Sequence, residues 1–325
     1  MNTEALRTVA ATYGTPTYIF DVREVEARIR LLRSLLPEDT GLCFAVKANP
    51  FLIPYVADLV DRLEVCSPGE YEICIQEQIA PEKIVVSGVN KTYESMKRIL
   101  SYSKGAGIYT IESEEHAKIL RTLAEKNQMP LSVLIRLSSG NQFGVDAETF
   151  LRLAKEIQES PYLTLAGVHY YAGTQKRQSK LEKELDTLTA FAKTFEEETG
   201  TVLNELEYGA GMKVSYFIND SEKDQRESEP EPQIQALAEK LRTCAYGKKT
   251  IELGRFLVSM SGYYLTRVMD VKRTAQPGFL ILDGGIHQIN YYGWMMGMKQ
   301  PEIEVLAEKD GDEELFHLCG SLCTV

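Results

Sequence analysis

Reactive side chains stand at the ends of several short apolar segments of this 325-residue chain. The segment LCFAVK (42–47) ends in Lys47, and a buried lysine is costly unless it is paired, neutral or covalently used. Burial is expected to lower the pKa of this amine, which would make it a good partner for an aldehyde carbonyl. The position alone fits a lysine at the rim of a sheet equally well.

Two later segments end in groups that suit an anion. LNELEYG (203–209) leads into Gly209, Ala210 and Gly211, where small residues let backbone N–H groups approach a phosphate. TIELG (250–254) carries Glu252, and Arg255 after it could bind that phosphate through two hydrogen bonds. A glycine pair alone is usually a turn, and the two charged residues could instead form a surface ion pair of little energetic value.

An aromatic segment completes the set of groups. LAGVHYY (165–171) carries His169 and Tyr171, and Thr174 follows shortly after. An aromatic side chain can stack on a planar ligand and the hydroxyl can donate to phosphate, although a single aromatic residue is more often part of a core. Together, the amine, the carboxylate, the phosphate cradle and the stacking surface are what a phosphorylated, planar, electron-accepting aldehyde requires.

The elements that must position these groups alternate regularly along the chain. Eight apolar segments of strand length are separated by helix-like segments, which predicts an α/β fold with a (β/α)8 TIM-type barrel. Ser113 is expected to cap a helix over 114–127, and a second helix is predicted over 178–199. Barrel enzymes carry their chemistry at the carboxyl ends of the strands, so the groups above should meet at one rim. The predicted strands are 42–47, 63–67, 84–88, 107–111, 131–137, 165–171, 203–209 and 250–254.

The end of the chain lacks long helices and is predicted to form a β domain. We expect residues 1–22 to join this domain through the strand-like segment PTYIFD (16–21), residues 23–260 to form the barrel, and residues 261–325 to form a partial C-terminal β domain. The acidic, proline-bearing stretch 219–233 is expected to be a long exposed loop at the mouth of the barrel. The β segments are predicted at 261–273, 279–285, 302–308 and 314–320.

Composition excludes several classes of function. The net charge of -11 argues against a nucleic-acid-binding surface. No apolar run approaches the roughly 20 residues of a membrane span, and the N-terminus lacks the pattern of a signal peptide, so a cytoplasmic protein is expected. The six cysteines form no CxxC pair and the four histidines no HxxxH pattern, which favours reduced thiols and no metal site.

Seven short motifs resemble the motif series of the fold-type III PLP-dependent decarboxylases. This alanine racemase-like family includes diaminopimelate and ornithine decarboxylases and relatives that act on amino acids tethered to acyl-carrier proteins. The resemblance covers nearly the whole chain, in the family's order. It implies the cofactor pyridoxal 5'-phosphate (PLP) and decarboxylation of an amino acid through a Schiff base on Lys47. The motifs are FAVKAN (44–49), VCSPGEYE (65–72), IVVSGVNKT (84–92), GVHYYAGTQ (167–175), ELGR (252–255), DGG (283–285) and GSLCT (320–324).

The resemblance also assigns roles to individual residues. It implies that Glu252 pairs with the pyridine nitrogen and that Cys323 is lent by one subunit to the partner's site, which implies a homodimer. Cys323 or a water would return the proton after loss of CO2. The phosphate would be held by Gly209, Ala210, Gly211, Thr174 and Arg255. Cofactor contacts are expected from His169 and Tyr171, and polar or substrate contacts from Glu64, Glu70, Arg136 and Asp283.

Departures from the family pattern bear on the substrate. Tyr171 stands where the ring-stacking residue is commonly histidine, and Gln142 stands where a basic residue is common. The sequence after DGG lacks the arginine and proline typical of diaminopimelate decarboxylases, which favours a specialised enzyme for a free or carrier-bound amino acid. Relatives continue well beyond Val325, so we expect a fragment, a site completed by a second polypeptide, or an impaired enzyme.

Two alternatives use the same barrel. An amino-acid racemase usually has an arginine at the pyridine nitrogen and a tyrosine base, and Glu252 argues against it. A non-catalytic PLP-binding protein would be a barrel alone, and the β segment with Cys323 argues against that.

Overall fold

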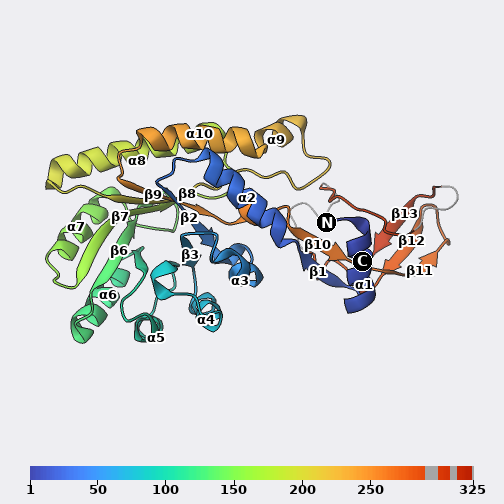
Figure 1. Cartoon of the computed structure of the whole chain (residues 1–325), viewed down its shortest axis with the longest axis horizontal. Coiled ribbons are helices and arrows are strands. Elements are labelled where there is room, and N and C mark those ends of the chain that lie inside the picture. The colour runs from blue at the N-terminus through green and yellow to red at the C-terminus, as the bar shows by residue number, and fades with distance from the viewer. Residues whose placement is uncertain (290–298, 308–312, 324–325) are drawn as a thin grey trace. The chain divides into compact units, whose positions relative to one another are not determined.

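The computed structural model of the chain describes residues 1–289, 299–307 and 313–323. It divides into two compact units, whose elements are labelled in Figure 1. The barrel unit consists of Val25–Val214 and Arg226–Val258. The β unit consists of Met1–Glu24, Ser215–Gln225 and the described part of Ser259–Val325.

Eight parallel strands close into a barrel in the order in which they occur along the chain. The first and last of them pair with each other, which places Cys43 of β2 beside Glu252 of β9 and closes the barrel. The predicted fold class, a (β/α)8 barrel with additional β structure, is therefore confirmed. The strands are β2 (Thr40–Ala45), β3 (Arg62–Val65), β4 (Ile84–Val86), β5 (Ile108–Ile111), β6 (Leu131–Arg136), β7 (Leu163–Tyr171), β8 (Glu205–Gly209) and β9 (Lys248–Leu253).

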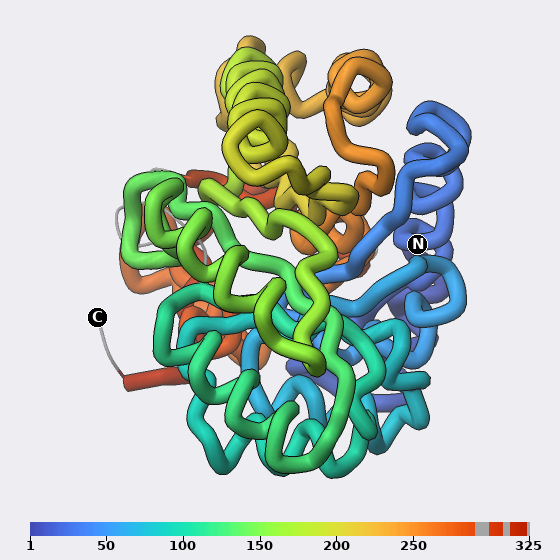
Figure 2. The backbone as a smooth tube through the Cα atoms, turned by 90° about the vertical axis from the view of Figure 1, so that its left-hand side faces the viewer, coloured from blue at the N-terminus to red at the C-terminus, as the bar shows by residue number. Residues whose placement is uncertain are grey.

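Side-chain caps mark the start of several of the helices that connect these strands. The Ser113 hydroxyl accepts a hydrogen bond from the backbone N–H of His116 at 3.2 Å, as predicted, and α6 begins there. Figures 1 and 2 show α8 beside α10, and the Lys240 ammonium of α10 donates to Asp186 of α8 at 2.8 Å. The helices are α2 (Val22–Leu35), α3 (Ile53–Val56), α4 (Pro68–Gln76), α5 (Tyr93–Ser103), α6 (Glu114–Asn127), α7 (Ala147–Gln158), α8 (Gln178–Thr199), α10 (Pro230–Thr243) and α11 (Arg255–Val258), with 3-10 turns η1 (Val46–Ala48), η2 (Pro50–Leu52) and η3 (Pro81–Lys83).

The β unit contains two small sheets. In one, the N-terminal strand β1 (Thr17–Phe20) pairs antiparallel with β10 (Gly262–Leu265). In the other, β12 (Gly278–Leu282) lies between antiparallel β11 (Val268–Lys272) and parallel β13 (Phe316–Cys319). The helix α1 (Thr3–Tyr13) precedes β1. None of the helices in the described part of the chain combines the length and hydropathy that a membrane crossing requires.

Two expectations about local structure are wrong. The stretch 219–233 is not one long loop, because it contains α9 (Glu222–Glu227) and the start of α10, where Pro230 occupies the first turn without losing a hydrogen bond. Residues 302–307 form no strand. The backbone carbonyl of Leu306 instead accepts a hydrogen bond from Arg7 of α1 at 2.6 Å, and Glu304 accepts one from Thr3 at 2.8 Å.

Candidate active site

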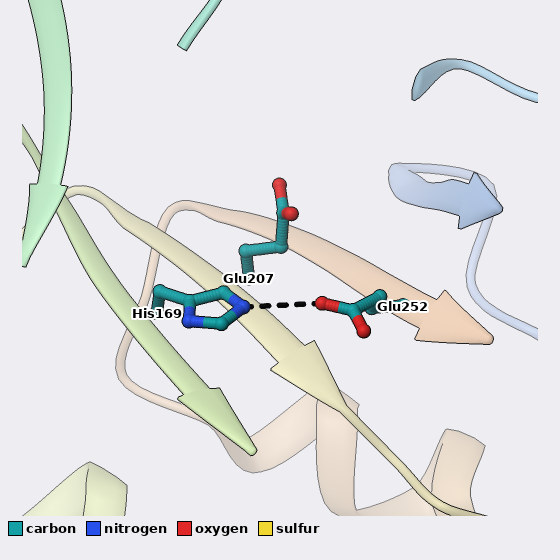
Figure 3. Close-up of side chains that lie close together, drawn as sticks. All are labelled: His169, Glu207 and Glu252. Atoms are coloured by element: carbon teal, nitrogen blue, oxygen red, sulfur yellow. Dashed lines mark hydrogen bonds and ion pairs between the residues drawn. The ribbon is translucent and has the colours of Figure 1, made fainter. Parts of the chain in front are cut away.

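Alternation along the strands directs polar side chains into the barrel from three neighbouring strands. His169 of β7, Glu207 of β8 and Glu252 of β9 are 2%, 0% and 4% exposed, respectively. Figure 3 shows the hydrogen bond between His169 Nε2 and Glu252 Oε2, which are 3.1 Å apart. One nitrogen or oxygen atom from each of the three side chains lies within 4.8 Å of the others. A small set of ionisable groups is therefore concentrated inside the barrel.

Lys47 joins this set from the turn that follows β2. The strand ends at Ala45, and the 3-10 turn η1 carries the lysine. Its Nζ donates to Glu64 Oε2 at 3.0 Å and to Glu252 Oε1 at 3.4 Å, while 41% of the side chain stays exposed. The structure therefore brings Lys47, Glu64 and Glu252 together, and through Glu252 it brings in His169.

The pKa of Lys47 in this group differs from the expectation. Burial alone would lower the pKa of Lys47, but the carboxylates of Glu252 and Glu64 outweigh it and raise the pKa above its ordinary value. The predicted lowering of this pKa is therefore wrong. Burial would raise the pKa of Glu252, but Lys47 and His169 hold it below its ordinary value. The amine must therefore lose a proton before it can attack a carbonyl, and Glu64 is the carboxylate nearest to it.

The chain segments after β7 and β8 approach each other more closely than side chains would allow. A Cβ atom added to Gly209 would lie 2.5 Å from Cδ2 of Tyr171. Gly211 has a φ of +58°, and a Cβ there would lie 2.1 Å from the carbonyl oxygen of Gly173. Only glycine fits at either position. These close contacts within the chain explain the glycines at 209 and 211, and binding of a phosphate by the turn 209–211 stays a prediction.

Tyr171 contacts Gly209 of this turn, and two further predicted residues lie on the segments that follow β7 and β9. Tyr171 lies with its ring centroid 5.6 Å from Lys47 Nζ, Thr174 lies exposed on the turn after β7, and Arg255 is the first residue of α11. Burial raises the pKa of Tyr171, whereas the charges of Lys47 and Arg255 oppose the rise. Inside the barrel, the buried Nδ1 of His169 has no hydrogen-bond partner among the described residues. An amine, a buried anion, an aromatic ring and a glycine turn in one place fit a phosphorylated pyridine aldehyde.

Three residues close to Lys47 and Arg136 were missed from the sequence. The Cys66 thiol donates to Glu64 Oε1 at 2.8 Å and lies 3.4 Å from Lys47 Nζ. Arg136 forms an ion pair of 2.9 Å with Glu112, which also lies 3.7 Å from the Lys91 ammonium. Cys66 and Glu112 directly follow β3 and β5. The rule that identified Lys47, chemistry at the carboxyl end of a strand, could have identified them as well.

Three further predicted residues have other hydrogen-bond partners or belong to the β unit. Glu70 of α4 accepts a hydrogen bond from the backbone N–H of Cys66 at 2.6 Å, so it fixes the turn after β3. Asp283 and Cys323 belong to the β unit. The Asp283 carboxylate accepts hydrogen bonds there from Thr266 at 2.7 Å and from the backbone N–H of Arg267 at 2.9 Å. Roles of Asp283 and Cys323 at the active site stay predictions.

A second charged layer lies deeper in the barrel. Arg62 of β3 donates to Glu207 Oε2 at 2.9 Å and also pairs with Glu205. Burial raises the pKa of Glu207 to about 7, with the Arg62 charge opposing the rise and the Glu252 charge adding to it. Glu207 therefore retains its proton in the folded protein at a pH where an exposed glutamate has lost it.

A Glu207→Gln variant is expected to change how stability depends on pH. The pKa of Glu207 is about 7 in the folded protein and 4.5 for an ordinary glutamate. The contribution of protonated Glu207 to stability is therefore complete below pH 4.5 and is lost as the pH rises through 7. Between these limits the wild type should lose on the order of 3 kcal/mol relative to the variant, which cannot ionise. Urea unfolding at a series of pH values measures this difference. Parallel stability curves for the two proteins would contradict it.

Comparison with known proteins places this site in a family. The family described as "Pyridoxal-dependent decarboxylase, pyridoxal binding domain" matches residues 22–259. Diaminopimelate decarboxylase of Pseudomonas aeruginosa is 28% identical, with 98% of this chain and 79% of that protein aligned. A Niallia circulans decarboxylase named for L-glutamyl acyl-carrier protein is 26% identical, covering 100% of this chain and 81% of that protein.

A solved structure shares the fold. The crystal structure of diaminopimelate decarboxylase from M. jannaschii with L-lysine superimposes with a TM-score of 0.83 at 21% identity, covering 98% of this chain and 78% of that one. The family match spans the whole barrel unit, which carries Lys47 and the glycine turn. The chain therefore belongs to the pyridoxal-dependent decarboxylases, a family of carboxy-lyases, and its barrel is the domain that binds pyridoxal phosphate.

Proposed function

We propose that this protein decarboxylates an amino acid, presented free or on an acyl-carrier protein, with Lys47 as the lysine that holds the cofactor covalently. One observation carries the proposal. Lys47 Nζ lies 3.4 Å from the buried Glu252, which is paired in register with Gly209 at the start of the glycine turn. The amine on η1, which follows β2, is thus adjacent to the anion on β9 and the proposed phosphate cradle at the end of β8.

Each residue of the group has a task in this proposal. Bound PLP supplies a ring that accepts the electrons of the bond to the departing carboxylate. Glu252, kept ionised by Lys47 and oriented by His169, favours a protonated ring nitrogen. Glu64 accepts the proton that Lys47 must lose, and Tyr171 packs against the ring. Thr174, Arg255 and the turn 209–211 hold the phosphate.

The identity of the substrate is proposed from the departures in sequence. Tyr171 and Gln142 depart from the family pattern, and the sequence after DGG lacks the arginine and proline typical of diaminopimelate decarboxylases. One relative of similar coverage is named for a carrier-bound glutamyl substrate. We therefore favour a specialised amino acid, free or tethered. In this proposal two subunits share their sites, with Cys323 of each returning a proton in the other and Asp283 near the substrate.

Borohydride trapping tests the covalent assignment. Purified protein incubated with PLP should show a visible absorbance band that disappears on reduction, and peptide mapping should find the reduced adduct on Lys47. Label on another lysine, such as the buried Lys91 or Lys176, would overturn the assignment.

Release of CO2 tests the reaction. The PLP-loaded protein is given a panel of free amino acids and the same amino acids as acyl-carrier thioesters, and the gas is quantified. Turnover should depend on PLP and on one substrate class. A protein that carries PLP on Lys47 but releases no CO2 from any member would leave the non-catalytic PLP-binding alternative.

A further inference from the structure

A second lysine, Lys176, lies buried beside the glycine turn and has no part in the chemistry described above. Its side chain is 1% exposed, and its ammonium donates to Glu184 Oε2 of α8 at 2.8 Å and to the carbonyl oxygen of Gly209 at 2.9 Å. The ammonium also lies 5.6 and 5.1 Å from the ring centroids of Tyr171 and Tyr208. A buried ammonium is costly, and this set of partners indicates a specific structural purpose.

Lys176 binds both ends of the turn. In addition to the contact with Gly209, its backbone N–H donates to the carbonyl oxygen of Gly211 at 2.9 Å. Carbonyl oxygens repel an anion, so a turn that binds phosphate must direct its carbonyls elsewhere. Here the carbonyls of both glycines are directed toward Lys176.

Further contacts fix the residues on either side of this turn. The side-chain amide of Gln175 donates to the carbonyl of Val214 at 2.8 Å and accepts from its N–H at 2.7 Å. Glu184, the partner of Lys176, also accepts a hydrogen bond from Tyr208 at 2.7 Å. The ion pair is therefore fixed at both members, with its positive end against Gly209.

We propose that Lys176 is a positioning residue for a phosphate monoester. It draws the carbonyls of the 209–211 turn away from the ligand and places a positive charge behind the turn. This inference rests on the proposed function, because the phosphate is that of PLP, and it adds a residue that no family motif named above contains. Because the ammonium is buried, its charge acts on the phosphate through a medium that screens poorly.

The test compares a ligand with phosphate and the same ligand without it. The variant Lys176→Met/Glu184→Gln removes the ion pair without leaving either charge buried and unpaired. The control Lys249→Met/Asp39→Asn removes an ion pair of 3.3 Å at the other end of β9. Affinities of the apoproteins for PLP and for pyridoxal are measured by absorbance titration, and thermal unfolding of each apoprotein reports folding.

Loss of the pair should weaken PLP binding about tenfold or more and pyridoxal binding far less, because only PLP carries the group that the turn holds. The control should leave both affinities at the wild-type value. Equal weakening for PLP and pyridoxal, or no weakening, would overturn the inference. Wild-type protein that forms the Lys47 adduct yet binds both ligands equally would overturn the phosphate cradle, and with it the role of Lys176, but not the covalent role of Lys47. Absence of the Lys47 adduct would instead refute the proposed function.

Discussion

A Lys47→Arg variant is expected to lose decarboxylation by about 10³-fold or more while keeping its fold. Arginine preserves the positive charge that Glu64 and Glu252 face at 3.0 and 3.4 Å in the wild type, so the buried carboxylates remain compensated. A guanidinium stays protonated and cannot attack an aldehyde. The variant therefore removes the covalent bond proposed for Lys47 and keeps the positive charge beside Glu64 and Glu252.

The measurement combines turnover with spectroscopy. The variant should show no band that borohydride abolishes, and no labelled peptide at position 47. A Lys249→Arg variant is the matched control, since it makes the same exchange on β9 at the pair with Asp39. Substantial CO2 release by Lys47→Arg would show that another amine carries the cofactor.

The barrel was predictable because its strands are buried on both faces. Segments such as LSVLIRL and TIELG are short and carry Leu, Ile or Val between turn-forming stretches, and the structure places β6 and β9 there, nearly all buried. Helix α8 was predictable over its whole length because its apolar stripe ends at Gly200, which adopts a left-handed conformation with a φ of 68°. Local pattern and tertiary burial agree in these elements.

Other features depend on tertiary contacts that local sequence does not encode. Residues 302–307 alternate like a strand, yet their hydrogen-bond partners are side chains of α1. The pKa of Lys47 follows two carboxylates contributed by β3 and β9, about 20 and 200 residues away in sequence, so position alone suggested the wrong direction. Lys176 reads as an ordinary surface residue in GTQKRQ until the structure places it against Gly209.

The candidate site was predictable where one rule applies, namely that barrel enzymes carry their chemistry at the carboxyl ends of the strands. Residues at the carboxyl ends of β2, β7, β8 and β9 were identified, and the structure groups Lys47, His169 and Glu252. The layer beneath, with Arg62 paired to Glu205 and Glu207, was not predicted, because Arg62 and Glu205 begin their strands and such charged residues resemble those of a solvated face. Only closure of the barrel shows that these charges are inside it.

A Glu252→Gln variant is expected to lower decarboxylation about 10²- to 10³-fold with little loss of PLP binding. Glutamine has the same shape and keeps a hydrogen-bonding group 3.1 Å from His169, but it removes the negative charge. Without that charge the ring nitrogen loses the partner that favours its protonated form, and the ring becomes a weaker electron acceptor. The phosphate contacts proposed for Thr174, Arg255 and the turn 209–211 do not involve the Glu252 side chain and should be unaffected.

The control for Glu252→Gln is Glu64→Gln, because both substitutions remove a carboxylate that contacts Lys47 Nζ. If Glu252 acts only through Lys47, both variants should slow formation of the covalent adduct and have similar steady-state rates. If Glu252 faces the ring nitrogen, it alone should shift the absorbance of the loaded protein and lower kcat. Equal effects of the two substitutions would remove the main argument for decarboxylation over racemisation, because that argument requires an anion opposite the ring nitrogen.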